Sequence, residues 1–198
     1  MDYRQIKGVS LKLYGELIMD RMKHLEQLAK VIRQKNMADD EIARIIGRPA
    51  LIGHTGEYVA AKVFNIELEQ NAVCKAIDGH FTDGFLDGKT VNIKWYAKQE
   101  GILDISPEAP PPDFYLVMAG AKAPAASSRG MTRPWLISQV FLFDARELLG
   151  TLGSRGVKIG IATSIRREYW EGAEIYPTSH TKQLILSDRQ KEMLALFG

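Results

Sequence analysis

Three side chains around one predicted β-hairpin have types and spacing suited to chemistry on phosphate esters. Strand-like segments flank Asp87-Gly88, and an Asp-Gly pair favours a two-residue type I′ turn between antiparallel strands. That turn sets Asp83 on the first strand opposite Asn92 on the second, and Lys94 shares the face of Asn92 because side chains alternate along a strand. We therefore expect a carboxylate, an amide oxygen and an amine to lie together on one face of the hairpin.

This combination of groups is useful for cleaving a phosphodiester. Carboxylate and amide oxygens are ligands that Mg²⁺ prefers, and the ion polarises a phosphoryl oxygen and lowers the pKa of a bound water. A neighbouring lysine orients or deprotonates that water and offsets charge in the transition state. Asp78-Gly79 is a competing Asp-Gly pair, but it lies outside the predicted hairpin, so we prefer Asp83 to Asp78 as the acid.

The beginning of the chain is predicted to be helical. Apolar residues recur at three- and four-residue steps over residues 14–32, which indicates a long amphipathic helix. A second, short helix is expected from Asp39 or Asp40 to Gly47, just before Pro49. Thr55 is the expected N-cap of a third helix, whose apolar face comprises Val59, Ala60, Val63 and Phe64.

The rest of the chain favours a sheet covered by helices, an α/β (α+β) fold. Residues 80–97 predict the hairpin, and residues 114–119 (FYLVMA) form a continuous apolar run typical of a strand buried on both faces. Further strands are expected at residues 135–143 and 157–162. Two more helices are expected, one beginning at Asp144 and one at a capping box of Ser187 and Gln190.

The composition is that of an ordinary globular protein. The 198 residues carry a formal net charge of +2 and include 45% hydrophobic and 25% charged residues. No apolar run is long enough to span a membrane, and the first residues lack the apolar core of a signal peptide, so we expect a soluble, cytoplasmic protein. A single cysteine, Cys74, excludes an intramolecular disulfide. Acidic residues are in excess over residues 51–113 and basic residues on either side, as suits a localised metal site that acts on a phosphate polymer.

Three segments resemble the PD-(D/E)xK restriction-endonuclease-like nucleases over about residues 51–143. They are GEYVAAKVF, which contains Glu57, then DGFLDGKTVNIK, then DFYLVM. The resemblance implies a central mixed sheet flanked by helices in residues 51–198, with residues 1–50 as an N-terminal helical extension. In that family the metal site comprises an acid on the first core helix, an Asp at the start of a hairpin and an (E/D)xK motif on its second strand. It therefore implies that Glu57, Asp83 and Asn92 hold Mg²⁺ or Mn²⁺ and that Lys94 activates or orients water.

The function implied by this resemblance is metal-dependent endonucleolytic hydrolysis of DNA. One departure from the motif opens an alternative, because Asn92 stands where the family usually has a second acid. An amide oxygen binds a cation without contributing charge, although Glu57 could supply the second carboxylate. The alternative is a catalytically silent nuclease-like module that binds DNA or a partner protein.

Five further residues are candidates for contact with nucleic acid. Tyr96 is expected on the face of Lys94, and His54 near Glu57; Lys122, Arg129 and Arg133 belong to a loop that could contact the phosphate backbone. Each also has a simpler structural explanation, as a core, capping or solvated loop residue. The long first helix either covers the sheet or forms the seam of a homodimer.

Overall fold

A computed structural model of the chain describes residues 3–69, 76–107, 110–122, 133–181 and 183–198, with side chains from residue 19 onwards. The chain divides into two compact units, Met1–Ala50 and Leu51–Gly198. None of the described helices combines the length and apolar character needed to cross a membrane.

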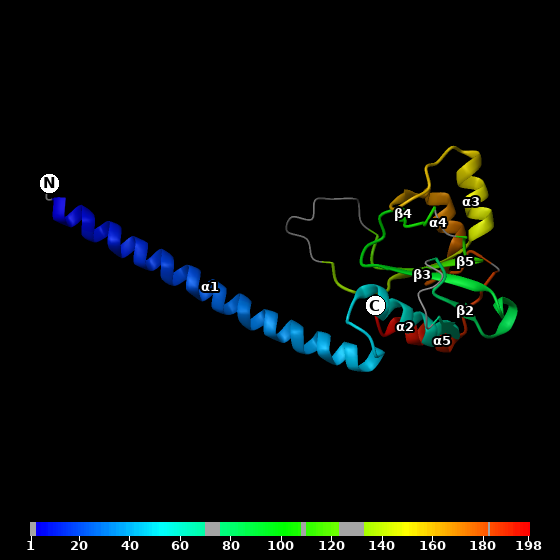
Figure 1. Cartoon of the computed structure of the whole chain (residues 1–198), viewed down its shortest axis with the longest axis horizontal. Coiled ribbons are helices and arrows are strands. Elements are labelled where there is room, and N and C mark those ends of the chain that lie inside the picture. Colours follow the sequence, from blue (N-terminus) through cyan, green and yellow to red (C-terminus); the bar gives the residue numbers. More distant parts are fainter. Residues whose placement is uncertain (1–2, 70–75, 108–109, 123–132, 182) are drawn as a thin grey trace. The chain divides into compact units, whose positions relative to one another are not determined.

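The first unit is one continuous helix, α1 (Tyr3–Ile46) (Figure 1). The expectation of two separate helices is wrong, because no glycine or proline interrupts residues 33–39 and the Lys35 ammonium pairs with the Asp39 carboxylate across the expected break. The helix ends where the sequence indicates. Gly47 adopts the left-handed conformation, with φ +70°, and its N–H donates to the Ala43 carbonyl.

The second unit has three layers, with a mixed six-stranded sheet between two pairs of helices (Figure 1). The sheet order is β1-β2-β3-β5-β6-β8, in which only β3 and β5 run parallel. The strands are β1 (Ile66–Leu68), β2 (Gly79–Phe81), β3 (Thr90–Tyr96), β5 (Phe114–Ala119), β6 (Gln139–Asp144) and β8 (Glu174–Tyr176). Strands β4 (Ile102–Leu103) and β7 (Thr163–Ser164) form a separate antiparallel pair. The mixed α+β architecture expected from the sequence is therefore confirmed.

Helices cover both faces of the sheet. On one face, α2 (Ile52–Phe64) and α5 (Asp188–Ala195) pack on a core that includes Val91, Ile93 and Trp95 of β3. On the other face, α3 (Ala145–Ser154) and α4 (Arg167–Ala173) pack on a second core that includes Tyr115 and Val117 of β5. Every residue of β5 is buried, which confirms the interpretation of its continuous apolar run.

Local capping signals are confirmed at two helices and wrong at a third. The Asp144 carboxylate accepts from the third residue of α3, and Ser187 and Gln190 form the capping box of α5. In contrast, Thr55 lies inside α2, where its N–H donates to the carbonyl of Leu51, the residue before the helix. The expected apolar face of α2, formed by Val59, Ala60, Val63 and Phe64, is nevertheless buried.

The turn at Asp87-Gly88 is of type II, not type I′. Asp87 has φ −49° and ψ 130°, and only Gly88 has a positive φ, of +73°, whereas a type I′ turn needs a positive φ at both positions. A 3-10 turn over Gly84–Leu86 precedes it, so the first strand of the hairpin is only β2. The pairs are Gly79 with Val91 and His80 with Thr90. The predicted pairing of Asp83 with Asn92 is therefore wrong.

The sequence patterns predicted one strand wrongly and did not indicate several short elements. Residues 157–162 are not a strand, and the strand nearest to them is β7. Strand β1, helix α4 and strand β8 were not expected. Each is no longer than seven residues, too short to show a hydrophobic period.

Close packing of α2 on β3 generates a stability prediction. A Cβ added at Gly56 would lie 2.9 Å from the Cβ of Trp95, which has little freedom to move, whereas one added at Gly53 on the same helix meets nothing within 4 Å. We expect Gly56→Ala to lower the free energy of unfolding by about 1–3 kcal/mol through overpacking. Gly53→Ala, the matched control, should be neutral or raise it by up to about 1 kcal/mol, because alanine restricts the unfolded chain and favours helix. Urea denaturation measures both, and equal effects would contradict this account of the helix–sheet contact.

Candidate functional site

Asp78, rather than Asp83, is hydrogen-bonded to β3 on either side of Asn92. The Asp78 N–H donates to the Val91 carbonyl at 2.9 Å, and the Ile93 N–H donates to Asp78 Oδ2 at 2.6 Å. Strand β2 begins at the next residue, so the carboxylate replaces a neighbouring strand as the acceptor for this N–H of β3. The carboxylate is thereby held against the strand at the residue that follows Asn92.

Asp83 belongs to a different part of the surface. It precedes the 3-10 turn, and Asn65 Nδ2 donates to its Oδ2 at 2.7 Å. Asp83 and Asn65 line a cavity of about 440 Å³ together with residues of α2 and α5, including Lys62 and Gln190. The residue that the sequence pointed to most strongly therefore binds the C-terminus of α2 rather than facing Asn92.

Asn92 and Lys94 share one face of β3, as expected. The alternate residues of the strand pack against α2, which directs Asn92 and Lys94 to the other face of the sheet. Asn92 is only 4% exposed, and its Oδ1 has no hydrogen-bond partner within the described part of the chain. Lys94 is half-buried and forms no ion pair with any described residue. An acceptor and a cation are thus placed two residues apart, and no described residue satisfies either of them.

Glu57 and His54 lie in the layer on the opposite side of the sheet. Both are half-buried on α2, whose Gly56 packs against Trp95. The structure therefore does not place the carboxylate of Glu57 on the face that carries Asn92 and Lys94. Among the described residues, no three His, Cys, Asp or Glu side chains are grouped in a way that could hold a metal ion.

Tyr96 shares the face of Lys94 but has a structural partner. Its hydroxyl accepts a hydrogen bond from the Asp104 N–H at 2.9 Å, and burial raises its pKa well above the ordinary value. The neutral hydroxyl thus links the segment after β4 to the sheet through a hydrogen bond.

The three basic residues after β5 that were expected to contact nucleic acid differ in their surroundings. Lys122 lines a cavity of about 710 Å³ on the face covered by α4. Arg133 Nη2 lies 3.7 Å from Oε1 of Glu100, a residue that lines the same cavity. Arg129 lies outside the described residues.

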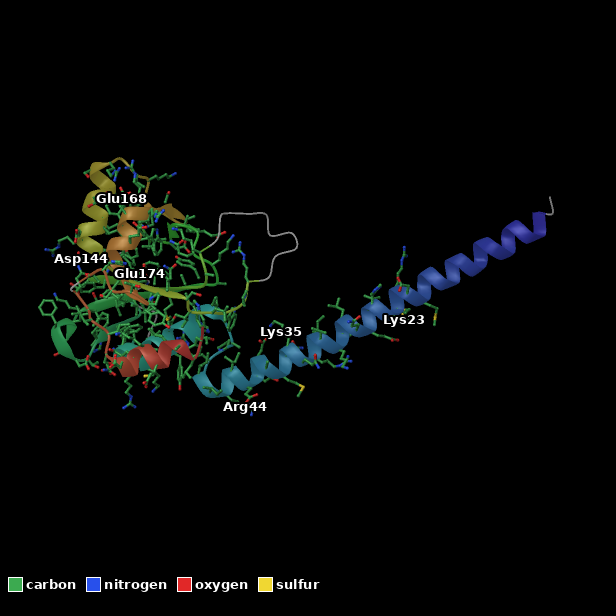
Figure 2. The ribbon with its side chains drawn as sticks, turned by 180° about the vertical axis from the view of Figure 1, so that it is seen from behind. Lys23, Lys35, Arg44, Asp144, Glu168 and Glu174 are labelled. Carbon is green, nitrogen blue, oxygen red and sulfur yellow. The ribbon has the colours of Figure 1, made fainter. Side chains whose placement is uncertain are left out.

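That cavity gathers polar groups that the sequence did not connect. Its floor includes Phe141 and Trp170, and Glu100 at its wall pairs with the buried Lys98 at 3.1 Å. Glu174, labelled in Figure 2, is 9% exposed, and its carboxylate has no hydrogen bond or ion pair with a described residue. Two further charges neutralise each other, because a hydrogen bond from Arg167 lowers the pKa of Glu171.

Sequence reasoning missed these cavity residues for a physical reason. Residues 98–100 directly follow β3, whereas Glu174 reaches the cavity only because β8 pairs Glu174 with Phe141 of β6. No short motif records such a long-range pairing. Asp78, in contrast, carried a visible signal, the second Asp-Gly pair.

The sequence profile of no known protein family matches the chain, and no curated protein sequence matches it.

The unsatisfied oxygen of Asn92 generates a second stability prediction. A buried acceptor without a partner costs about 1–3 kcal/mol, so Asn92→Leu, which keeps the branched arrangement of side-chain heavy atoms, should raise the free energy of unfolding by about 1 kcal/mol or more. The matched control is Thr163→Val, because buried Thr163 Oγ1 accepts from the Gly160 N–H at 2.9 Å and donates to the Gly160 carbonyl. In that control we expect the free energy of unfolding to fall by about 1 kcal/mol. Denaturant titration of both variants decides the matter, and a destabilised Asn92→Leu would show that the amide is satisfied within the fold.

Proposed function

We propose that this protein is a Mg²⁺- or Mn²⁺-dependent nuclease that hydrolyses phosphodiester bonds in DNA. One observation carries the proposal: the buried Asn92 oxygen has no described partner, the half-buried Lys94 follows two residues later on the same face of β3, and the Asp78 carboxylate accepts from the N–H of the residue between them, Ile93. Two oxygen donors and an adjacent cation are the groups that such chemistry uses.

The architecture is consistent with a restriction-endonuclease-like core. A mixed sheet with helices on both faces is what the resemblance implies, and α2 supplies the first helix of that core. Asp78 immediately precedes β2, the first strand of the hairpin, which is the place that the family motif gives to its aspartate. The proposal therefore assigns to Asp78 the role that sequence reasoning gave to Asp83, and keeps Asn92 and Lys94 on the second strand.

The donor set fits a hard divalent cation. Asp78 and Asn92 offer carboxylate and amide oxygens, and a cation would satisfy the acceptor that the fold leaves without a partner. When bound, Mg²⁺ would polarise a phosphoryl oxygen and acidify water. Lys94 would attract the phosphodiester, orient the attacking water by hydrogen bonding and offset charge in the transition state.

Asn92 also supports the alternative, a silent nuclease-like module that binds DNA or a partner protein. Asp78 and Lys94 carry opposite charges, so with a neutral residue at position 92 the three side chains have no excess negative charge to attract a cation. A carboxylate at position 92 adds that charge. Asn92→Asp is therefore the substitution that distinguishes a site that binds metal weakly from one that no longer binds it.

Cleavage of supercoiled plasmid in millimolar Mg²⁺ or Mn²⁺ tests the proposal. We expect Asp78→Asn and Lys94→Ala each to slow nicking by about 100-fold or more, the usual contribution of a positioned acid–base or charge-stabilising group. Asp78→Asn keeps an oxygen for the Ile93 N–H, so loss of activity reports on charge rather than folding.

Asp83→Asn is the matched control, because it removes one carboxylate from the same hairpin and should leave the nicking rate unchanged. Asn92→Asp should lower the Mg²⁺ concentration needed for half-maximal nicking. Undiminished cleavage by both Asp78→Asn and Lys94→Ala would overturn the assignment. Salt-dependent DNA binding without cleavage, by the unaltered chain and by Asn92→Asp, would favour the silent module.

A further inference from the structure

Helix α1 carries a seam of exposed apolar side chains at coiled-coil spacing. Leu25, Leu28 and Ile32 follow one another at steps of three and four residues and are 58%, 53% and 46% exposed. The same alternating steps continue through Ile42 to Ile46 at the end of the helix. Such a seven-residue repeat describes one helix face that packs against another helix.

Three charged residues interrupt the seam at positions equivalent to the apolar ones. Arg21, Lys35 and Asp39 continue the same alternation of three- and four-residue steps. In a parallel pair of identical helices each residue of the seam meets its own copy, so arginine would face arginine and aspartate would face aspartate. Like charges at facing positions destabilise a helix pair. The seam therefore disfavours parallel self-association.

An antiparallel pair centred near residue 30 resolves these conflicts. In that register Leu28 faces Ile32 of the partner subunit, and Arg21 faces Asp39 of the partner subunit. A shift of one heptad step in one direction sets Arg21 against an isoleucine and Asp39 against Leu28. A shift in the other direction leaves both charges against Ile32 and Tyr14, respectively. Of these three registers, only the one about residue 30 sets the opposite charges of Arg21 and Asp39 against each other.

Lys35 is compatible with this register. It would lie across from Leu25 of the partner subunit, where its aliphatic stem can cover the leucine while the ammonium stays at the edge. Its ammonium already pairs with Asp39 one turn along the same helix; Lys35 and Arg44 are labelled on α1 in Figure 2. Asp39 would thus join Lys35 of its own helix and Arg21 of the partner subunit in one charged cluster.

We propose that two copies of this chain associate through α1 as an antiparallel coiled coil, whose register is fixed by the Arg21–Asp39 pairing between subunits. The occupant of the seam is a second copy because Arg21 and Asp39 of the same seam complement each other in the antiparallel register about residue 30. The overlap of the two helices from residue 14 to residue 46 extends over about 48 Å at 1.5 Å per residue. The proposal is independent of the nuclease assignment, since it concerns residues outside that site.

Multi-angle light scattering of the full chain after size exclusion, without DNA, tests the association. We expect a dimer at micromolar concentration. Arg21→Asp and Asp39→Arg should each raise the dissociation constant by about 10-fold or more, because each sets like charges face to face. The double variant Arg21→Asp/Asp39→Arg should restore the dimer.

Matched controls lie on the far side of the helix. Lys23→Asp and Glu41→Arg make similar charge reversals away from the seam and should leave the dissociation constant unchanged. Circular dichroism of every variant separates loss of pairing from loss of helix. A monomeric unaltered chain at tens of micromolar would overturn the proposal, and so would a double variant that associates no better than the single ones.

The orientation has its own test. In a Cys74→Ser background, a mixture of Leu28→Cys and Ile32→Cys chains should form a disulfide between the two variants on oxidation. Leu28→Cys alone should cross-link poorly. The opposite pattern would indicate a parallel pair and refute the antiparallel register.

Discussion

The parallel pairing of β3 with β5 is the constraint on which the candidate site depends. Six consecutive residues of β3, Val91–Tyr96, pair in register with Phe114–Ala119, and β3 also has β2 on its other side. A central strand covered on both faces has no solvent side, so alternation alone decides which residues enter which core. Because Val91, Ile93 and Trp95 fill the α2 layer, Asn92 must be buried in the opposite layer.

Hydrogen bonds between Thr90 and Asp113 fix the point at which the pairing of β3 with β5 begins. The N–H and hydroxyl of Thr90 both donate to Asp113 Oδ2 at 2.9 Å, and the Asp113 N–H donates to Thr90 Oγ1. These hydrogen bonds from Thr90, together with the charge of Lys89, lower the pKa of Asp113. The ionised form of Asp113 therefore joins the first residue of β3 to the residue before β5, and a slip by one residue would break every one of these bonds.

Features fixed by neighbouring residues were predictable, whereas the hairpin register was not. The buried run of β5, the Asp144 cap and the Ser187–Gln190 box each depend on residues close in sequence, and all three are confirmed. An Asp-Gly pair is compatible with both type I′ and type II turns. What favours type II here is distant in sequence.

The loop before the turn shows what that distant influence is. The N–H and hydroxyl of Thr82 donate to the Asn65 carbonyl at 2.9 and 2.8 Å, and Leu86 is buried in the α2 core. These contacts draw residues 82–86 away from β3 toward the end of α2, so Asp83 leaves the strand and Asp78 takes its place. A local sequence pattern carries no information on contacts with residues some twenty positions away, and such contacts decide the turn type here.

The burial of position 92 accounts for a neutral amide there. An aspartate there would bury a second carboxylate close to Asp78, and a buried charge without a counter-ion costs several kcal/mol or shifts its pKa until it is neutral. The amide avoids most of that cost and still presents an oxygen acceptor in the buried layer.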